Sequence, residues 1–347
     1  MSDDNQTFQA GLIGCGRMGT TIDDEVRGRP NATLPYCHAA GYKATDRVDL
    51  VAATDIDEAQ LERAKERYDI PRGYDDYREM IEQEDLDILS VTTPLGTHFE
   101  PVCFAAEYGV PAIYCEKALC RSMEQADKLV EACQTNGTHF NLGVNRRYSP
   151  LFRTIRELIE DGEIGDLRAI IGHVGAGGIS GKSHAVDIVS FLNGDEPADW
   201  VQGESNFELD DIDGDQLQVH PRARLGHIGF SNGVRGYLTQ AGNWEIEIDG
   251  EDGKIRTFNN GHTATIRTKQ GEWDFLQEQE FPEYEPRSGT LGCIDELVAA
   301  LDGGPETSGN IEIAAAGQEI CMAMFDSHRR NGERVSLPLE NRALTLP

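Results

Sequence analysis

Lysine is scarce in this sequence, and positive charge as a whole is outnumbered. Only seven of the 31 basic residues are lysine, against 61 acidic residues, so the formal net charge is −30 over 347 residues. An acidic surface of this strength repels the phosphate backbone of nucleic acids and the headgroups of anionic lipids. We therefore expect no nucleic-acid partner and no binding to membrane surfaces.

The acidic residues are spread along the chain, which predicts a hydrated acidic surface rather than a disordered acidic tail. Together with the scarcity of lysine and the mean hydropathy of −0.47, this pattern indicates a halophilic, salt-adapted protein. The alternative is a soluble acidic enzyme without any adaptation to salt.

No C-x-x-C pair occurs among the eight cysteines, and several of them stand in apolar surroundings. Buried reduced thiols explain them better than disulfides or zinc ligands, so we expect no metal site. No apolar run approaches the roughly 18 residues of a membrane-spanning helix, and the polar first residues do not resemble a signal peptide. We expect a cytoplasmic protein.

A G-C-G-R-M-G sequence at 14–19 follows an apolar, strand-like segment at 8–13. In such a turn the first glycine permits a tight bend, the second lets the backbone approach a pyrophosphate, and the third lets the next helix pack closely. The helix then directs its free N–H groups at the phosphates. The motif predicts a dinucleotide site formed by Gly14, Gly16, Arg17, Met18 and Gly19.

A second strand expected at 48–54 ends in Asp55. A carboxylate there can accept both ribose hydroxyls of NAD and repels the 2′-phosphate of NADP, so NADP is the less favoured cofactor. The number of residues between the glycine turn and Asp55 exceeds the usual spacing of about 20. We interpret residues 20–37 as an insertion before a helix that begins near His38, either a lid over the cofactor or a surface loop.

Helices expected at 56–68, 73–82, 100–108 and 122–136 alternate with apolar strands expected at 86–91, 112–115 and 140–144. Near-continuous apolar strands are typical of a parallel sheet that is covered on both faces. The repeated strand–helix units predict an α/β fold whose N-terminal domain, residues 1–145, is a doubly wound Rossmann sheet.

The pattern changes after residue 145. Helices are expected at 151–161, around 184–192, at 292–301 and at 311–330, and short strands separated by turn residues run from 200 to about 281. This predicts a second, α+β domain over 146–347 with a large, mostly antiparallel open sheet, for substrate binding and oligomerisation. Its C-terminal tail can pack back on the first domain.

This ordered set of motifs resembles the glucose-fructose oxidoreductase/inositol dehydrogenase/MocA family of NAD(P)-dependent sugar and polyol oxidoreductases. The resemblance covers nearly the whole chain and includes T-P at 93–94, E-K-A at 116–118, N-R-R-Y at 145–148 and H-A-V-D at 184–187. It implies a carbohydrate, polyol or sugar-acid substrate, NAD as the cofactor, and a homodimer or homotetramer. The cofactor contacts expected in full are Gly14, Gly16, Arg17, Met18, Gly19, Asp55, Thr93, Pro94, His98, Glu116 and Lys117.

Oxidation of a secondary alcohol removes a hydride from carbon and a proton from oxygen, and a cation must stabilise the developing alkoxide. The resemblance assigns this catalytic position to Lys117, although Ala118 replaces the proline of the family's E-K-P segment, with a small expected effect on backbone rigidity. His184 suits proton transfer because imidazole titrates near neutral pH. Asp187 lies three residues on, on the same helical face, and is the third expected catalytic residue.

The sequence departs from the family pattern D-x-G-x-H-x-x-D at two positions. Ser180 stands in place of the first aspartate and cannot act as a base near neutral pH, and Lys182 replaces the glycine and adds a cation that could meet an acidic substrate. We expect Arg147, Ser180, Lys182 and His184 to bind the substrate. Two other functions stay open. One is a redox-neutral lyase, hydrolase or epimerase that uses tightly held NAD through a keto intermediate, and the other is a non-catalytic dinucleotide sensor.

Overall fold

The computed structural model describes residues 6–271 and 275–347, and the chain divides into two compact units. The first unit contains Met1–Tyr148 and Arg287–Ala315, and the second contains Ser149–Pro286 and Ala316–Pro347. The segment Arg287–Ala315 belongs to the first unit, although it lies within the range 146–347 that was expected to form the second domain.

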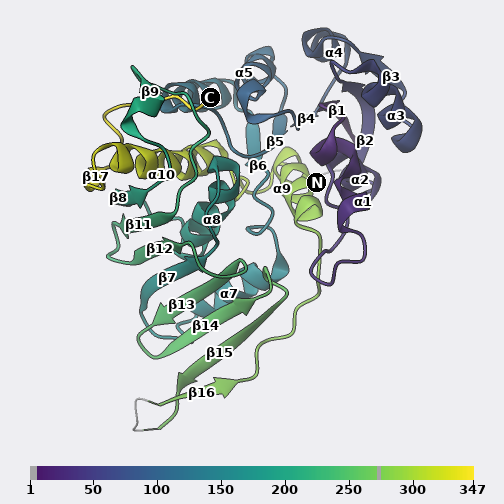
Figure 1. Ribbon diagram of the computed structural model, residues 1–347. Coiled ribbons are helices and arrows are strands. Elements are labelled where there is room, and N and C mark those ends of the chain that lie inside the picture. The colour runs from purple at the N-terminus through teal and green to yellow at the C-terminus, as the bar shows by residue number, and fades with distance from the viewer. Residues whose placement is uncertain (1–5, 272–274) are drawn as a thin grey trace. The chain divides into compact units, whose positions relative to one another are not determined.

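The first unit is built on six parallel strands in the order β3-β2-β1-β4-β5-β6 (Figure 1). All residues of β4 and β5 are buried, because helices cover both faces of the sheet. The strand order reverses between β1 and β4, which is where open α/β sheets bind their ligands. The predicted Rossmann sheet is confirmed. Its strands are β1 (Phe8–Ile13), β2 (Val48–Thr54), β3 (Arg72–Tyr74), β4 (Ile88–Val91), β5 (Ala112–Cys115) and β6 (His139–Leu142).

The helices of this unit begin and end at residues suited to those positions. The side chain of Asp57 accepts hydrogen bonds from the first amides of α3, and Gly137 ends α6 with a φ of 67°. The helix expected at 73–82 begins only at Tyr77, because the residues before it pair with β2 as the short edge strand β3. The elements are η1 (Arg17–Thr21), α1 (Ile22–Val26), α2 (His38–Lys43), α3 (Glu58–Tyr68), α4 (Tyr77–Gln83), η2 (Leu95–Thr97), α5 (Phe99–Tyr108), α6 (Met123–Asn136) and α9 (Gly289–Leu301).

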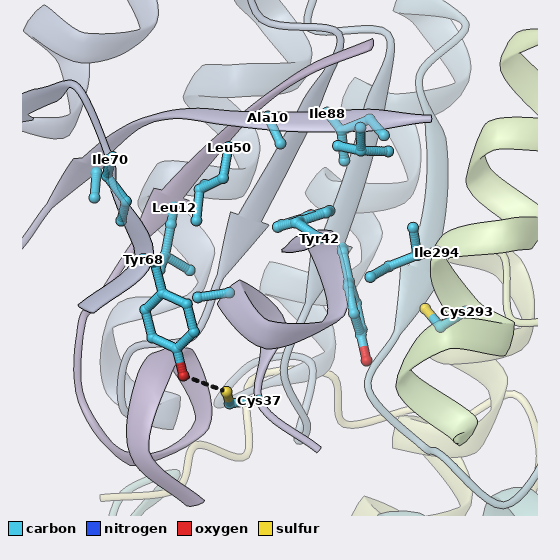
Figure 2. Packing of buried hydrophobic residues seen from close by; sticks show 14 of the residues in the cluster. Ala10, Leu12, Cys37, Tyr42, Leu50, Tyr68, Ile70, Ile88, Cys293 and Ile294 are labelled. Atoms are coloured by element: carbon cyan, nitrogen blue, oxygen red, sulfur yellow. Dashed lines mark hydrogen bonds between the residues drawn. The ribbon is translucent and has the colours of Figure 1, made fainter. Parts of the chain in front are cut away.

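Helices α2 and α9 pack together over one face of the sheet. Figure 2 shows Tyr42 of α2 beside Ile294 of α9, in a buried cluster that also contains Leu12 of β1. A Cβ atom on Gly41 would lie 2.7 Å from Cδ1 of Ile294, so the two helices approach as closely as they do because position 41 has no side chain. This packing fixes the start of α2, where His38 lies.

The second unit is built on a nine-stranded sheet in the order β16-β15-β14-β13-β7-β12-β11-β8-β17 (Figure 1). Within the described ranges, β7 and β12 form its one parallel pair, so the predicted mostly antiparallel sheet is confirmed. The C-terminal tail adds β17 to the edge of this sheet beside β8. The strands are β7 (Leu167–His173), β8 (Ala198–Glu204), β11 (Leu225–Phe230), β12 (Arg235–Thr239), β13 (Glu245–Gly250), β14 (Gly253–Phe258), β15 (Thr263–Lys269), β16 (Leu276–Gln279) and β17 (Val335–Ser336).

Three α-helices and a small hairpin complete the described part of the chain. Helices α7 (Pro150–Glu160) and α8 (Ile179–Leu192) belong to the second unit, and α10 (Ile311–Arg329) begins in the first unit and continues in the second. The acidic segment at 210–215 lies in a small hairpin of β9 (Ile212–Asp213) and β10 (Gln216–Leu217), preceded by η3 (Leu209–Asp211). Across residues 6–271 and 275–347, no helix has the length and apolar character to cross a membrane.

Candidate active site

The C-terminal ends of four neighbouring strands carry the residues expected to hold the cofactor. The glycine turn at 14–19 follows β1, Asp55 follows β2, Thr93 and Pro94 follow β4, and Glu116 and Lys117 follow β5. Because the strands are parallel, all four ends lie at one edge of the sheet, the edge at which ligands bind in this architecture. The structure therefore brings these residues to one edge of the first unit.

Each glycine of the turn has a different physical reason to be glycine. Gly14 has a φ of +92°, which other residues rarely adopt, and a Cβ on Gly19 would lie 2.2 Å from the carbonyl oxygen of Gly14. Gly16 has an extended backbone, and a Cβ there would find its nearest atom, Gln60 Oε1, only at 3.7 Å. Backbone conformation explains Gly14 and packing within the protein explains Gly19, whereas the open space at Gly16 fits the approach of a pyrophosphate.

The two residues between Gly16 and Gly19 take different positions. The exposed guanidinium of Arg17 forms an ion pair with Glu25 at 2.8 Å. Met18 is partly buried and packs against the hydrophobic cluster of the first unit. Arg17 would have to leave Glu25 to contact a phosphate, and the side chain of Met18 contributes to packing beneath the turn.

Asp55 ties the end of β2 to the glycine turn. Its Oδ2 accepts a hydrogen bond from the amide of Cys15 at 2.6 Å, and its Oδ1 accepts one from the amide of Asp57 at 2.9 Å. Each carboxylate oxygen has a further lone pair that could accept a ribose hydroxyl. The next residue, Ile56, is fully exposed and offers an apolar surface beside this carboxylate. Ile56 is not among the expected cofactor contacts, although an apolar residue directly after the strand-end aspartate is a signal that could have indicated it.

The insertion at 20–37 is only partly a loop. Its first residues are helical, since η1 runs directly into α1, and α2 begins at His38 as predicted. Buried Asp23 accepts hydrogen bonds from the amides of Tyr36 and Cys37, both at 2.8 Å, and Cys37 Sγ lies 3.3 Å from the hydroxyl of Tyr68 (Figure 2). The middle of the insertion, residues 27–31, is exposed. Both ends of the insertion therefore have a structural role, and the choice between a lid and a surface loop concerns only residues 27–31.

His98 joins the loops that follow β4 and β5. The ring is fully buried, with Nε2 2.6 Å from the carbonyl oxygen of Thr93 and Nδ1 2.8 Å from that of Ala118. Burial lowers the pKa of His98, although the two carbonyls favour the protonated ring, which alone can donate to both. With both ring nitrogens directed at protein carbonyls, His98 holds the two loops together, and Thr93 and Pro94 present the accessible surface.

Glu116 and Lys117 form an ion pair at the end of β5. Oε2 of Glu116 lies 2.9 Å from Nζ of Lys117, and Oε1 lies 3.3 Å from Nε2 of His38. Burial alone would raise the pKa of Glu116, but the positive charge of Lys117 and the contact with His38 outweigh it and hold that pKa well below its usual range. Glu116 is buried, so it does not face a ligand directly, whereas the side chain of Lys117 is 19% exposed. The Lys117–Ala118 peptide bond is cis.

Helix α8 of the second unit carries four of the predicted residues on two opposite faces. Ser180, His184 and Asp187 are spaced four and three residues apart, so they share one face. The ring of His184 lies edge-on to Trp244, with 6.3 Å between the ring centroids. Lys182, two residues from both Ser180 and His184, points to the opposite side of the helix.

The placement of Lys182 differs from the expectation that it binds substrate. Its side chain is buried, and Nζ donates a hydrogen bond to the carbonyl oxygen of Gly175 at 2.7 Å. Burial lowers the pKa of Lys182 to about 8. This burial could not be predicted, because a sequence motif does not tell which side of α8 faces the protein interior.

Arg147 also differs from the expectation of a substrate contact. It is fully buried, and its Nη1 donates a hydrogen bond to the carbonyl oxygen of Ser308 at 2.8 Å. This contact connects the end of the first chain segment of unit one with the returning segment Arg287–Ala315. Among the described residues, no group of three or more histidine, cysteine or acidic side chains could hold a metal ion, and the described cysteines are all free thiols.

Comparisons with known proteins agree with this architecture. A model of the GFO_IDH_MocA family, described as an oxidoreductase family with an NAD-binding Rossmann fold, matches residues 8–144. Myo-inositol 2-dehydrogenase of Thermotoga maritima is 25% identical over 285 residues, which cover 76% of this chain and 79% of that protein. The scyllo-inositol 2-dehydrogenase (NAD(+)) of Bacillus subtilis is 26% identical over 288 residues, covering 76% of this chain and 81% of that protein.

A solved structure shares the fold over nearly the whole chain. Levoglucosan dehydrogenase, in complex with NADH and levoglucosan, superimposes with a TM-score of 0.77 at 18% identity, covering 96% of this chain and 100% of that one. Over residues 8–144 the chain therefore matches the oxidoreductase family with an NAD-binding Rossmann fold, and over 76% of its length it is similar to inositol dehydrogenases.

Proposed function

We propose that this protein is an NAD-dependent oxidoreductase that transfers a hydride between a CH–OH group of a sugar, polyol or sugar acid and nicotinamide. The observation that carries this proposal is the position of Lys117. Its ammonium lies at the same sheet edge as the glycine turn and Asp55, and the buried carboxylate of Glu116 holds it at 2.9 Å. The relatives named inositol dehydrogenases support a polyol or sugar substrate.

In such a reaction different residues bind the cofactor and stabilise the charge on the substrate. The backbone at Gly16 leaves room for the pyrophosphate, and Asp55 accepts the ribose hydroxyls and disfavours a 2′-phosphate, which is why we propose NAD rather than NADP. When bound, the nicotinamide accepts or returns the hydride. The Lys117 ammonium stabilises the negative charge that develops on the substrate oxygen.

Proton transfer is assigned to α8. We propose that His184 takes the proton from the substrate hydroxyl during oxidation and returns it during reduction, because imidazole changes charge near neutral pH. Asp187 shares the helical face of His184 and orients the ring, and Ser180, on the same face, can hydrogen-bond a substrate hydroxyl.

One observation favours a second candidate, a redox-neutral reaction through a keto intermediate with the cofactor regenerated in each cycle. Ser180 occupies the position of the family's first aspartate, and a hydroxyl there cannot act as a base near neutral pH. An enzyme of this type would still need Asp55 and Lys117, but would release no reduced cofactor.

The experiment is a turnover assay on protein purified at several KCl concentrations, which also tests the proposed adaptation to salt. Bound NAD(H) is measured first, and then NADH formation is followed with a panel of inositols, other polyols, sugars and aldonates. Stoichiometric NADH formation, lost in Lys117→Ala, supports the oxidoreductase. Product without net NADH supports the redox-neutral enzyme. NAD binding with no turnover on any substrate contradicts both and leaves the sensor.

A further inference from the structure

A line of buried polar side chains connects α2 with Lys117. The hydroxyl of Tyr42 lies 2.6 Å from Oγ of Ser90, Oγ of Ser90 lies 2.8 Å from Nδ1 of His38, and Nε2 of His38 lies 3.3 Å from Oε1 of Glu116. The other carboxylate oxygen of Glu116 contacts Nζ of Lys117 at 2.9 Å. We call Tyr42, Ser90, His38 and Glu116 the His38 chain. None of its four members is more than 3% exposed.

The hydrogen atoms of the His38 chain can be assigned without any buried positive charge on the ring. An ionised carboxylate only accepts, so Nε2 of His38 must carry the hydrogen that it donates to Glu116. A neutral ring then accepts at Nδ1 from the hydroxyl of Ser90, and Ser90 accepts from the hydroxyl of Tyr42. Burial raises the pKa of Tyr42, which keeps its hydrogen in place. One neutral tautomer of His38 therefore accounts for all three contacts within the His38 chain.

Neighbouring residues hold both partners of the contact between His38 and Glu116. The ring of His38 stacks on Tyr114 with 3.8 Å between the centroids. A Cβ on Gly143 would lie 2.8 Å from Oε1 of Glu116, so the carboxylate fills the space that position 143 leaves open. Because Glu116 is enclosed in this way, its second oxygen, Oε2, is directed at Lys117.

The insertion at 20–37 delivers His38 to this position. Asp23 binds the amides of the last two insertion residues, and Thr290 of α9 donates a hydrogen bond to the carbonyl oxygen of Tyr36 at 2.9 Å. Ser288 donates a further hydrogen bond to the carbonyl oxygen of Pro35. Residues 35–37, immediately before His38, are thus fixed from two directions, although the insertion lengthens the path from the glycine turn.

We propose that His38 is a positioning residue of the active site, which acts through Glu116 to hold the ammonium of Lys117 where the substrate oxygen develops its charge. The inference rests on the proposed function, in which Lys117 stabilises that charge. His38 itself needs no contact with substrate or cofactor. Without its donor, one oxygen of a buried carboxylate would lose its hydrogen bond and Glu116 would be free to reorient.

The test is a double-mutant cycle of His38→Ala and Lys117→Ala, with kcat and KM measured on the best polyol found. We expect His38→Ala to lower kcat about 10- to 100-fold, the effect of a misplaced catalytic group, with little change in KM. In the Lys117→Ala background the same substitution should cause no further loss. His38→Gln, whose amide can donate to Glu116, should recover part of kcat. Leu129→Ala, a buried truncation on α6 away from the His38 chain, controls for lost stability.

The outcomes separate this inference from the proposed function. Full kcat in His38→Ala, with Lys117→Ala impaired, overturns the role of His38 and leaves the proposed function intact. The role of His38 is also overturned if the losses of kcat in His38→Ala and Lys117→Ala add in the double variant. It is likewise overturned if Leu129→Ala lowers kcat as much as His38→Ala does. Full activity in Lys117→Ala overturns both proposals. If His38→Ala does not fold, two other variants replace it: His38→Gln, and Glu116→Gln, in which glutamine keeps the shape of glutamate. If Glu116→Gln then lowers kcat by the same factor with and without Lys117→Ala, the inference is overturned.

Discussion

Alanine substitutions at two glycines of the same turn should have opposite consequences. In Gly16→Ala the new methyl group finds its nearest protein atom at 3.7 Å, and the backbone at φ −78° and ψ −152° is already extended. In Gly19→Ala the methyl group would lie 2.2 Å from the carbonyl oxygen of Gly14 and 2.9 Å from Oγ1 of Thr92. We expect Gly16→Ala to fold normally and bind NAD poorly, and Gly19→Ala to be unstable even without NAD.

The magnitudes follow from these contacts. Gly16→Ala should change the free energy of unfolding by no more than about 1 kcal/mol, because alanine mainly restricts the unfolded chain. Its methyl group keeps the pyrophosphate from the backbone, and the loss of one charge-assisted hydrogen bond, about 1.5–3 kcal/mol, raises the Kd for NAD about 10- to 150-fold. Gly19→Ala should lose about 1–3 kcal/mol of stability or more through overpacking.

Urea unfolding of the NAD-free proteins and calorimetric titration with NAD measure the two quantities independently. Wild-type affinity for NAD in Gly16→Ala would refute the argument that the space at Gly16 receives the pyrophosphate. A loss of stability in Gly16→Ala as large as in Gly19→Ala would refute the assignment of that space to a ligand, since the methyl group would then meet the protein itself.

Three further predictions concern the anchors around this site. Asp23→Ala leaves two backbone N–H groups without their acceptor and should lower the free energy of unfolding by about 2–4 kcal/mol. Asp24→Ala, at an exposed ion pair with Arg67, should lower it much less, and urea unfolding compares the two variants. Lys182, with a pKa of about 8, binds fewer protons folded than unfolded between pH 8 and its normal pKa of about 10.4, so stability rises with pH there. Lys182→Met should therefore exceed wild type in stability at pH 7, and the difference should shrink over that range in unfolding curves. Asp55→Asn, which removes the charge but not the shape, should lower the preference for NAD over NADP at least about tenfold in Kd, and an unchanged ratio would contradict the role of that carboxylate.

Much of the first unit could be predicted because its signals are local. Strand β2 and its terminal Asp55, the apolar strands β4 and β5, and the start of α2 at His38 all follow from hydrophobic pattern and turn residues. The edge strand β3 was missed, since three residues are too few to show a period. The return of α9 to the first unit was missed as well, because an apolar helix face does not tell which sheet it covers.

The site shows the same division between local and long-range information. Lys117 and the glycine turn were identified from short motifs, and their common sheet edge follows from the parallel strand order. The contact between His38 and Glu116 joins residues 78 positions apart and leaves no trace in a single sequence. The burial of Arg147 and Lys182 could not be predicted either, because the identity of a basic residue does not tell whether its charge contacts solvent or a backbone carbonyl.

The central claim is hydride transfer to NAD, and isotope transfer tests it most directly. A polyol that is turned over is prepared with deuterium on the carbon that bears the reacting hydroxyl, and the cofactor released by the enzyme is analysed by mass spectrometry. We predict one deuterium in the released NADH, with transfer slowed at least about 100-fold in Lys117→Ala through loss of charge stabilisation. Product formed without labelled NADH in solution would contradict net oxidation, and transfer at the wild-type rate in Lys117→Ala would contradict the role of that lysine.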